Sequence, residues 1–165
     1  IRHVVFYTWV CIFRQSYTGG LAKTGKENKL SKLRNSTDYI VIHCAATPND
    51  MDVGASEIDR WHKERGWIGI GYHKVIRRDG TIEDGRDIAV SGAHVRGVNQ
   101  TSVGICMIGT DEFEDVQFES LKDLIVSLLD KYPDAKVRGH RDFPNVKKEC
   151  PGFDVESWMK KSMED

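Results

Sequence analysis

The chain has 165 residues, 39% of them hydrophobic and 30% charged, which is the size of one domain with a buried core. Its formal net charge is −1, but residues 1–35 carry seven Lys/Arg and one acidic residue, whereas residues 36–165 carry the remaining 17 basic and 24 acidic residues. The acidic balance of residues 36–165 argues against a nucleic-acid partner.

The N-terminal segment differs in composition from the rest of the chain. An apolar run, Val4 to Phe13, is followed by a stretch rich in glycine and lysine. A run of ten residues is too short to span a bilayer, so we expect no stable membrane insertion. The favoured interpretation of residues 1–35 is a basic and apolar extension outside the catalytic domain, either a non-native tag or a flexible segment. A strand added to the domain and an export signal are the alternatives.

Residues 36–165 have the pattern of a single α/β domain. The β-branched run "YIVIHCA", Tyr39 to Ala45, predicts a buried strand. The following "SEIDRWHKERG" has helical spacing and a stop signal at Gly66. In "YHKVIRRDGTIEDG", the Asp79-Gly80 pair is a strong signal for a hairpin between two short strands.

The second half of the domain continues the alternation of strands and helices. "SVGICMIG", Ser102 to Gly109, predicts a central strand, and "VQFESLKDLIVSLLDKY" predicts a long amphipathic helix ended by Pro133. "AKVRGH" fits a last strand, and "DVESWMKK" fits a closing helix capped by Asp154. The sequence therefore predicts a central mixed β-sheet flanked by helices.

The four cysteines give no sign of a disulfide framework. Cys11, Cys44, Cys106 and Cys150 have no paired spacing, and two of them lie in apolar runs typical of buried strands. We therefore expect reduced thiols.

Three potential metal ligands follow or end predicted elements: His43, His140 and Cys150. Two histidines and one thiolate would meet the need of a hydrolytic zinc site, which uses three protein ligands and leaves the fourth position to water. Taken singly, however, each has a common structural explanation: a strand-end histidine, a loop histidine bonded to Asp142, and a small buried thiol. Neither HExxH nor CxxC is present, so spacing leaves both interpretations open.

An ordered set of motifs is more specific: "STDYIVIHCAAT", "EIDRWHKERGW", "GYHKVIRRDGT", "GRD", "NQTSVGICMIG", "RGHRD" and "KKECPGFD". From Ser36 to about Trp158 the chain resembles the zinc-dependent N-acetylmuramoyl-L-alanine amidases, the family that includes peptidoglycan-recognition proteins. Within it, the motifs are most similar to those of the amidase-type lysozymes (endolysins) of T-odd coliphages.

The resemblance implies an activity and a set of functional residues. It implies that His43, His140 and Cys150 bind Zn²⁺ and that Tyr72 and Lys148 are catalytic. The implied reaction is hydrolysis, by zinc-activated water, of the amide between the lactyl group of N-acetylmuramic acid and L-alanine in bacterial peptidoglycan. Lys148 would stabilise the oxyanion, and Tyr72 would donate a hydrogen bond or relay a proton.

The thiol ligand and the other histidines need separate comment. A bound metal, with nearby Lys147 and Lys148, is expected to favour a thiolate at Cys150. His94 matches a family histidine on a loop beside the cleft, so we predict a substrate contact for it, with a structural loop role as the alternative. His62, on the core-facing side of its helix, is expected to be a packing residue. His73 alternates with Tyr72 along a strand and is expected to face the other way, so neither is assigned a catalytic role.

Two other functions compete with a wall-lysing amidase. Members of this family that only bind peptidoglycan typically lose the zinc cysteine, which is present here as Cys150. The endolysin resemblance also implies a second partner, phage RNA polymerase, which this protein would bind and inhibit. A serine hydrolase fits poorly, because there is no GxSxG motif.

The implied setting is that of a phage lysis enzyme. We expect a monomer made in the host bacterial cytoplasm that reaches the cell wall after another protein opens the membrane. Export by the apolar N-terminal run is the alternative.

Overall fold

The computed structural model describes residues 32–164. The strands are β1 (Tyr39–Cys44), β2 (Lys74–Ile76), β3 (Ile82–Asp84), β4 (Ser102–Met107) and β5 (Lys136–Gly139). The α-helices are α1 (Ala55–Glu64), α2 (Asp115–Lys131) and α3 (Val155–Glu164), and two short 3₁₀ helices are η1 (Asn99–Thr101) and η2 (His140–Asp142). The predicted strands and helices are confirmed with end shifts of a few residues.

The five strands form one sheet in the order β3-β2-β4-β1-β5. β1 runs parallel to both β4 and β5, and β2 runs parallel to β4. Only β3 is antiparallel to its neighbour β2, so the predicted mixed sheet is confirmed. Because β1 lies between two parallel neighbours, its C-terminal end opens at the edge where α/β sheets usually hold their functional residues.

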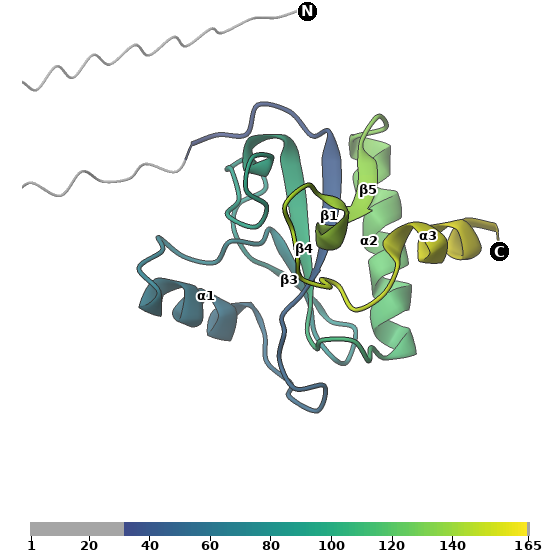
Figure 1. Cartoon of the computed structure of the whole chain (residues 1–165), viewed down its shortest axis with the longest axis horizontal. Helices are drawn as coiled ribbons and strands as arrows, with labels where there is room; N and C mark the ends of the chain where they lie inside the picture. Colours follow the sequence, from purple (N-terminus) through teal and green to yellow (C-terminus); the bar gives the residue numbers. More distant parts are fainter. Residues whose placement is uncertain (1–31, 165) are drawn as a thin grey trace, which may run out of the picture.

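Helices cover both faces of this sheet (Figure 1). Ile40 and Ile42 of β1 join a core with the inward face of α2 and with Val155 of α3. Alternation along the strand turns His43 to the opposite face. On that face a smaller core contains Ile58 of α1. The helix α2 and the helix α3 therefore lie on one side of the sheet, and α1 on the other.

The long helix α2 supplies most of the larger core from one stripe. The buried residues of this stripe are Gln117, Leu121, Leu124, Ile125 and Leu128. The Nε2 atom of Gln117 donates to the carbonyl of Ile108, 3.0 Å away, which attaches the first turn of the helix to the end of β4. The helix ends at Lys131, ahead of Pro133, as the sequence predicted.

The predicted hairpin joins β2 to β3 through Asp79 and Gly80. Gly80 has a φ of 83°, a left-handed conformation that glycine adopts without a steric penalty. The carboxylate of Asp79 accepts a hydrogen bond from the backbone N–H of Thr81 at 2.9 Å. The turn therefore uses both residues of the predicted pair.

Residues 32–35 are attached to the domain. The backbone N–H of Arg34 donates to the carbonyl of Ala89 at 2.8 Å, and that of Asn35 donates to the carbonyl of Gln100 at 2.8 Å. The Nε atom of Arg34 also donates to the carbonyl of Ile88 at 2.6 Å. The remainder of the segment interpreted as an extension (residues 1–35), namely residues 1–31, lies outside the described part of the chain.

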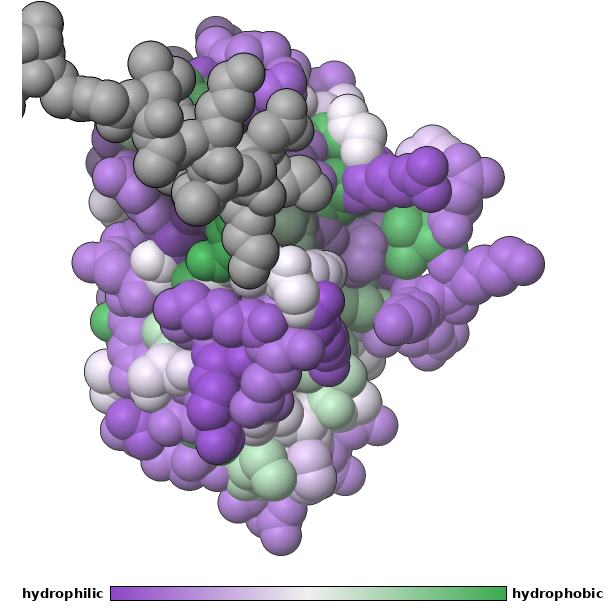
Figure 2. All heavy atoms as spheres, turned by 90° about the vertical axis from the view of Figure 1, so that its left-hand side faces the viewer, coloured by the Kyte–Doolittle hydropathy of each residue, from purple (hydrophilic) through white to green (hydrophobic). Residues whose placement is uncertain are grey.

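The surface on the side opposite α3 is mostly hydrophilic, with hydrophobic residues in small separate groups (Figure 2). Within residues 32–164, no helix has the length and apolar composition needed to cross a bilayer.

Candidate metal and catalytic site

Strand register brings His43 and His140 together. Ile42 of β1 pairs with Gly139 of β5. His43 directly follows Ile42 in the sequence, and His140 directly follows Gly139. Their ring centroids lie 4.6 Å apart. The Asp142 carboxylate, the partner in the structural alternative for His140, instead accepts a hydrogen bond from the Gly139 N–H at 2.7 Å. The parallel pairing of β1 with β5 therefore builds the two-histidine part of the site.

Cys150 reaches the same place from the loop after η2. The backbone N–H of Arg141 donates to the carbonyl of Cys150 at 2.8 Å, which holds the loop against η2. The Cys150 Sγ atom accepts a hydrogen bond from the backbone N–H of Cys44 at 3.3 Å. It also lies 3.9 Å from the Nδ1 atom of His43. The loop thus places a sulfur atom beside the end of β1.

The three donors fit a small, thiophilic metal ion. One ligand atom from each of His43, His140 and Cys150 lies within 4.8 Å of the others. Tetrahedral zinc with ordinary bond lengths would separate a nitrogen and a sulfur ligand by about 3.6 Å. The observed 3.9 Å between His43 Nδ1 and Cys150 Sγ needs only a slight contraction to reach this value.

The electrostatics keep both histidines neutral. Burial lowers the pKa of His43 well below 6.5, and the nearby His94 and His140 lower it further. The pKa of His140 is lowered first by burial and then by the positive charge of Lys148. Only a neutral imidazole offers a lone pair, so these shifts favour metal binding at neutral pH.

The neighbouring residue Cys44 affects the ionisation of the Cys150 thiol. A hydrogen bond with Cys44 and burial raise the pKa of Cys150, while the hydrogen bond with Cys150 lowers the pKa of Cys44 to about 7. Without a metal, the Cys150 thiol therefore stays protonated. The thiolate expected at Cys150 when a metal is bound, with Lys147 and Lys148 nearby, stays a prediction. A metal ion held by Cys150 would lower the pKa of Cys150 below that of Cys44, because a thiol must be deprotonated to bind a metal.

Tyr72 lies beside His43, just before β2. Its ring centroid is 5.1 Å from that of His43. Burial raises the pKa of Tyr72 well above 10.0, and the neighbouring thiols Cys106 and Cys150 raise it further. The phenol is therefore protonated at neutral pH and available as a hydrogen-bond donor.

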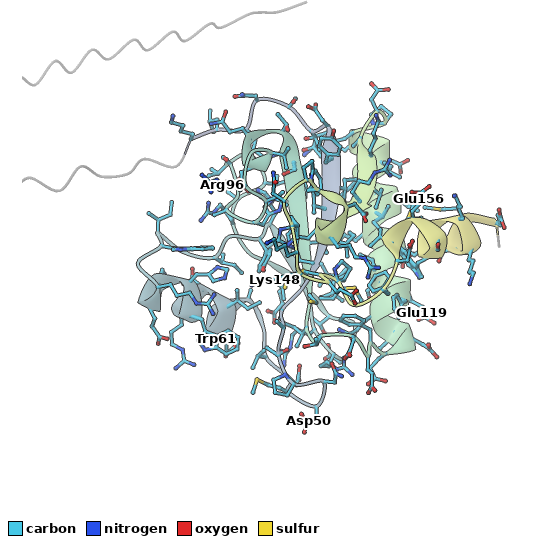
Figure 3. The ribbon with its side chains drawn as sticks, in the orientation of Figure 1. Asp50, Trp61, Arg96, Glu119, Lys148 and Glu156 are labelled. Carbon is cyan, nitrogen blue, oxygen red and sulfur yellow. The ribbon has the colours of Figure 1, made fainter. Side chains whose placement is uncertain are left out.

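Lys148 is exposed and lies in front of the sheet, in the centre of the view in Figure 3. Its backbone carbonyl accepts the N–H of Cys150 at 3.0 Å, which ties the lysine to the loop that carries the sulfur. Its positive charge also lies near enough to His140 to contribute to the lowered pKa of that imidazole.

The remaining histidines occupy different positions. The Nδ1 atom of His94 lies 2.9 Å from the Nε2 atom of His43, on the side of the ring away from Cys150. The predicted substrate contact of His94 stays a prediction. His62 is buried, as expected of a packing residue, and His73 is buried as well. The Nδ1 atom of each accepts a backbone N–H, that of Gly71 for His62 and that of Gly104 for His73.

Sequence reasoning missed the residues behind His94. Ser102 and Gly104 were assigned only to a buried strand, yet the Ser102 hydroxyl lies 3.3 Å from His94 Nε2. Gly104 pairs in register with Val41, and Cys106 pairs with His43. Because residues two apart in a strand share a face, Gly104 lies on the same face of the sheet as His43. A serine and a glycine in an otherwise apolar strand indicate that this part of β4 is unusual. They do not identify the side chain that packs against it.

Comparison with known proteins agrees with this geometry. A family model described as N-acetylmuramoyl-L-alanine amidase matches residues 33–153. The chain is 43% identical over 139 residues to the endolysin of Escherichia phage T7, which covers 79% of this chain and 91% of that protein.

Solved structures share the fold. The N-acetylmuramoyl-L-alanine amidase LysC from Clostridium intestinale superposes with a TM-score of 0.69 at 35% identity, covering 78% of this chain and 86% of that one. Drosophila PGRP-LB superposes with a TM-score of 0.67 at 30% identity, covering 78% and 82%. The resemblance inferred from the motifs is confirmed, and the chain belongs to the N-acetylmuramoyl-L-alanine amidase family.

Proposed function

We propose that this amidase is a zinc-dependent phage endolysin that hydrolyses the bond between the lactyl group of N-acetylmuramic acid and L-alanine in bacterial peptidoglycan. Family membership gives the enzyme class, an amide hydrolase. The metal, its ligands and the roles of individual side chains are the content of the proposal.

The observation that carries the proposal is the cluster of His43, His140 and Cys150. Their ligand atoms converge to within 4.8 Å at the C-terminal ends of two parallel strands. Two histidines and a cysteine form a donor set typical of catalytic zinc, in which one coordination position stays open. The binding-only alternative lacks support from this set, because the cysteine that such proteins typically lose is present.

A zinc ion bound here would polarise the scissile carbonyl and make water a stronger nucleophile. The side chains around it would stabilise the negative charge that develops on the substrate oxygen. The protonated phenol of Tyr72 would donate to the carbonyl oxygen as negative charge builds on it. The ammonium group of Lys148, carried two residues before Cys150, would stabilise the same charge from the solvent side.

The setting of the reaction and two further properties stay predictions. They are synthesis in the host cytoplasm with access to the wall after membrane opening, a monomeric state, and binding to phage RNA polymerase. Loss of metal would separate the last of these from wall cleavage, since a protein contact does not need the zinc chemistry.

The first test measures metal content and cleavage on the same preparation. We expect about one equivalent of zinc per chain and release of peptides with N-terminal L-alanine from purified peptidoglycan. Chelation should stop the release, and added zinc should restore it. Protein that binds peptidoglycan but contains no metal and releases no peptide would contradict the proposal and favour the binding-only function.

Replacing Lys148 by alanine should lower kcat without loss of metal. We expect a decrease of about 10- to 100-fold, less than for a buried oxyanion donor, because water screens an exposed ammonium group. Steady-state peptide release and zinc content are the measurements. Lys147→Ala is the matched control, since it removes an exposed lysine from the adjacent position. Equal kcat values for the two variants would remove Lys148 from the mechanism.

A further inference from the structure

The ring of His94 occupies a slot between two glycines. A Cβ atom on Gly92 would lie 2.5 Å from His94 Cδ2, and one on Gly104 would lie 2.7 Å from His94 Cγ. The loop that carries the ring is held by Asn99, whose Oδ1 atom accepts the backbone N–H groups of His94 at 2.8 Å and Val95 at 2.9 Å. The absence of side chains at both glycines therefore allows the ring to sit in this position.

Both ring nitrogens of His94 belong to one line of polar groups that starts at His43. The Nδ1 atom of His94 is 2.9 Å from His43 Nε2. Its Nε2 atom is 3.3 Å from the Oγ atom of Ser102. The Ser102 hydroxyl donates to the carbonyl of Val98 at 2.7 Å. The line therefore ends at a backbone carbonyl, a group that can only accept.

That end point sets the direction of the hydrogen bonds. Because the Ser102 hydroxyl donates its only proton to Val98, its oxygen accepts from Nε2–H of His94. A neutral imidazole has one N–H, so Nδ1 of His94 is then an acceptor. It accepts from Nε2–H of His43. The Nδ1 atom of His43 is left with a free lone pair, and this is the atom that faces Cys150.

We propose that His94, oriented by Ser102, is a positioning residue that holds His43 in the tautomer whose Nδ1 lone pair points at the metal site. The inference rests on the proposed function for the identity of the metal. The arrangement of the hydrogen bonds belongs to the protein alone and is set before any metal binds.

A histidine in this role has a specific consequence. Metal-bound histidines usually donate their other N–H to a carboxylate, a carbonyl or water, and this bond fixes the ring and its tautomer. Here the acceptor is a second imidazole, which accepts only when it is itself in the correct tautomer. Ser102 supplies that condition, so the preference of His43 depends on a hydroxyl two hydrogen bonds away.

The tautomer can be measured without metal or substrate. In the metal-free protein, ¹⁵N NMR of the histidine side chains at neutral pH should show His43 protonated at Nε2 and unprotonated at Nδ1. His94→Leu should lose this preference and give a mixture. Wild-type protein with the proton on His43 Nδ1, as a charged His94 would require, would overturn the inference. A protein that keeps the predicted tautomer yet binds no zinc would contradict the proposed function instead.

Metal affinity provides the second readout. Chelator competition should show zinc binding weakened by about 10- to 100-fold in His94→Leu, the range for loss of such a partner. His94→Asn should recover part of the loss, because asparagine carries an oxygen acceptor on Cγ where histidine carries Nδ1. A purely steric role, or a role in substrate contact alone, predicts equal affinities for the two variants or no loss in either, and either result would refute the inference.

Two further variants guard against misfolding. Ser102→Ala removes the hydroxyl that accepts from His94 and leaves both imidazoles in place. Like His94→Leu, it should weaken zinc binding. The matched control is His62→Leu, which removes a buried imidazole that lies outside the line and should leave zinc affinity unchanged. Thermal unfolding of each metal-free variant identifies any that fail to fold. Unchanged affinity in a folded Ser102→Ala would remove Ser102 from the proposal.

Discussion

The Cys150→Ser variant is expected to lose both its bound zinc and its amidase activity. A serine hydroxyl stays protonated at neutral pH and cannot supply the anionic ligand that the thiolate provides. Loss of a neighbour of a metal ligand already costs about 10- to 100-fold, so loss of the ligand itself should reduce kcat/KM by more than about 100-fold. Zinc content and peptide release from purified peptidoglycan measure the two effects.

Cys106→Ala is the control for removal of a buried thiol. Cys106 is fully buried in β4, and its Sγ atom lies 3.9 Å from the carbonyl of Met107. This variant should keep one equivalent of zinc, with a moderate loss of stability from the small cavity. If Cys150→Ser kept its zinc and its cleavage activity, the ligand assignment would be wrong.

The fold could be predicted from local patterns because each element has a clear period or a clear boundary. Alternating and β-branched runs gave the strands, the spacing of apolar residues gave α2, and Asp79-Gly80 gave the hairpin. The order of strands in the sheet did not follow from these patterns. That β1 lies between β4 and β5 is a long-range packing result, and it is the pairing of Ile42 with Gly139 that makes neighbours of His43 and His140.

The environment of the site was less predictable than its members. The motifs predicted His43, Tyr72 and Cys150, because each of these residues falls at a position where the family motif has a functional residue. The hydrogen bond between the Cys44 N–H and Cys150 Sγ was not predicted, since it depends on the contact between a strand end and a distant loop. Likewise, nothing in the order of residues along the chain shows which ring fills the space beside Gly104.

Tyr72 combines two properties that favour an essential hydrogen bond from its phenol. Its ring lies against His43, so the side chain borders the proposed metal site. Its raised pKa keeps the proton on the oxygen throughout the neutral range, and the first cause of that shift is burial. A donor removed from water is stronger toward a developing negative charge than an exposed one, because less solvent competes or screens.

Tyr72→Phe is therefore expected to lower kcat by about 100- to 1,000-fold, the effect of losing one oxyanion donor. Phenylalanine keeps the ring, so zinc content and the unfolding temperature should stay close to those of the wild type. Tyr132→Phe is the matched control, because the Tyr132 hydroxyl accepts from Arg34 at 3.4 Å, near the end of α2. A kcat for Tyr72→Phe equal to that of Tyr132→Phe would show that the phenol packs beside the site without acting on the substrate. A loss of zinc in Tyr72→Phe would instead make the phenol a support of the ligands.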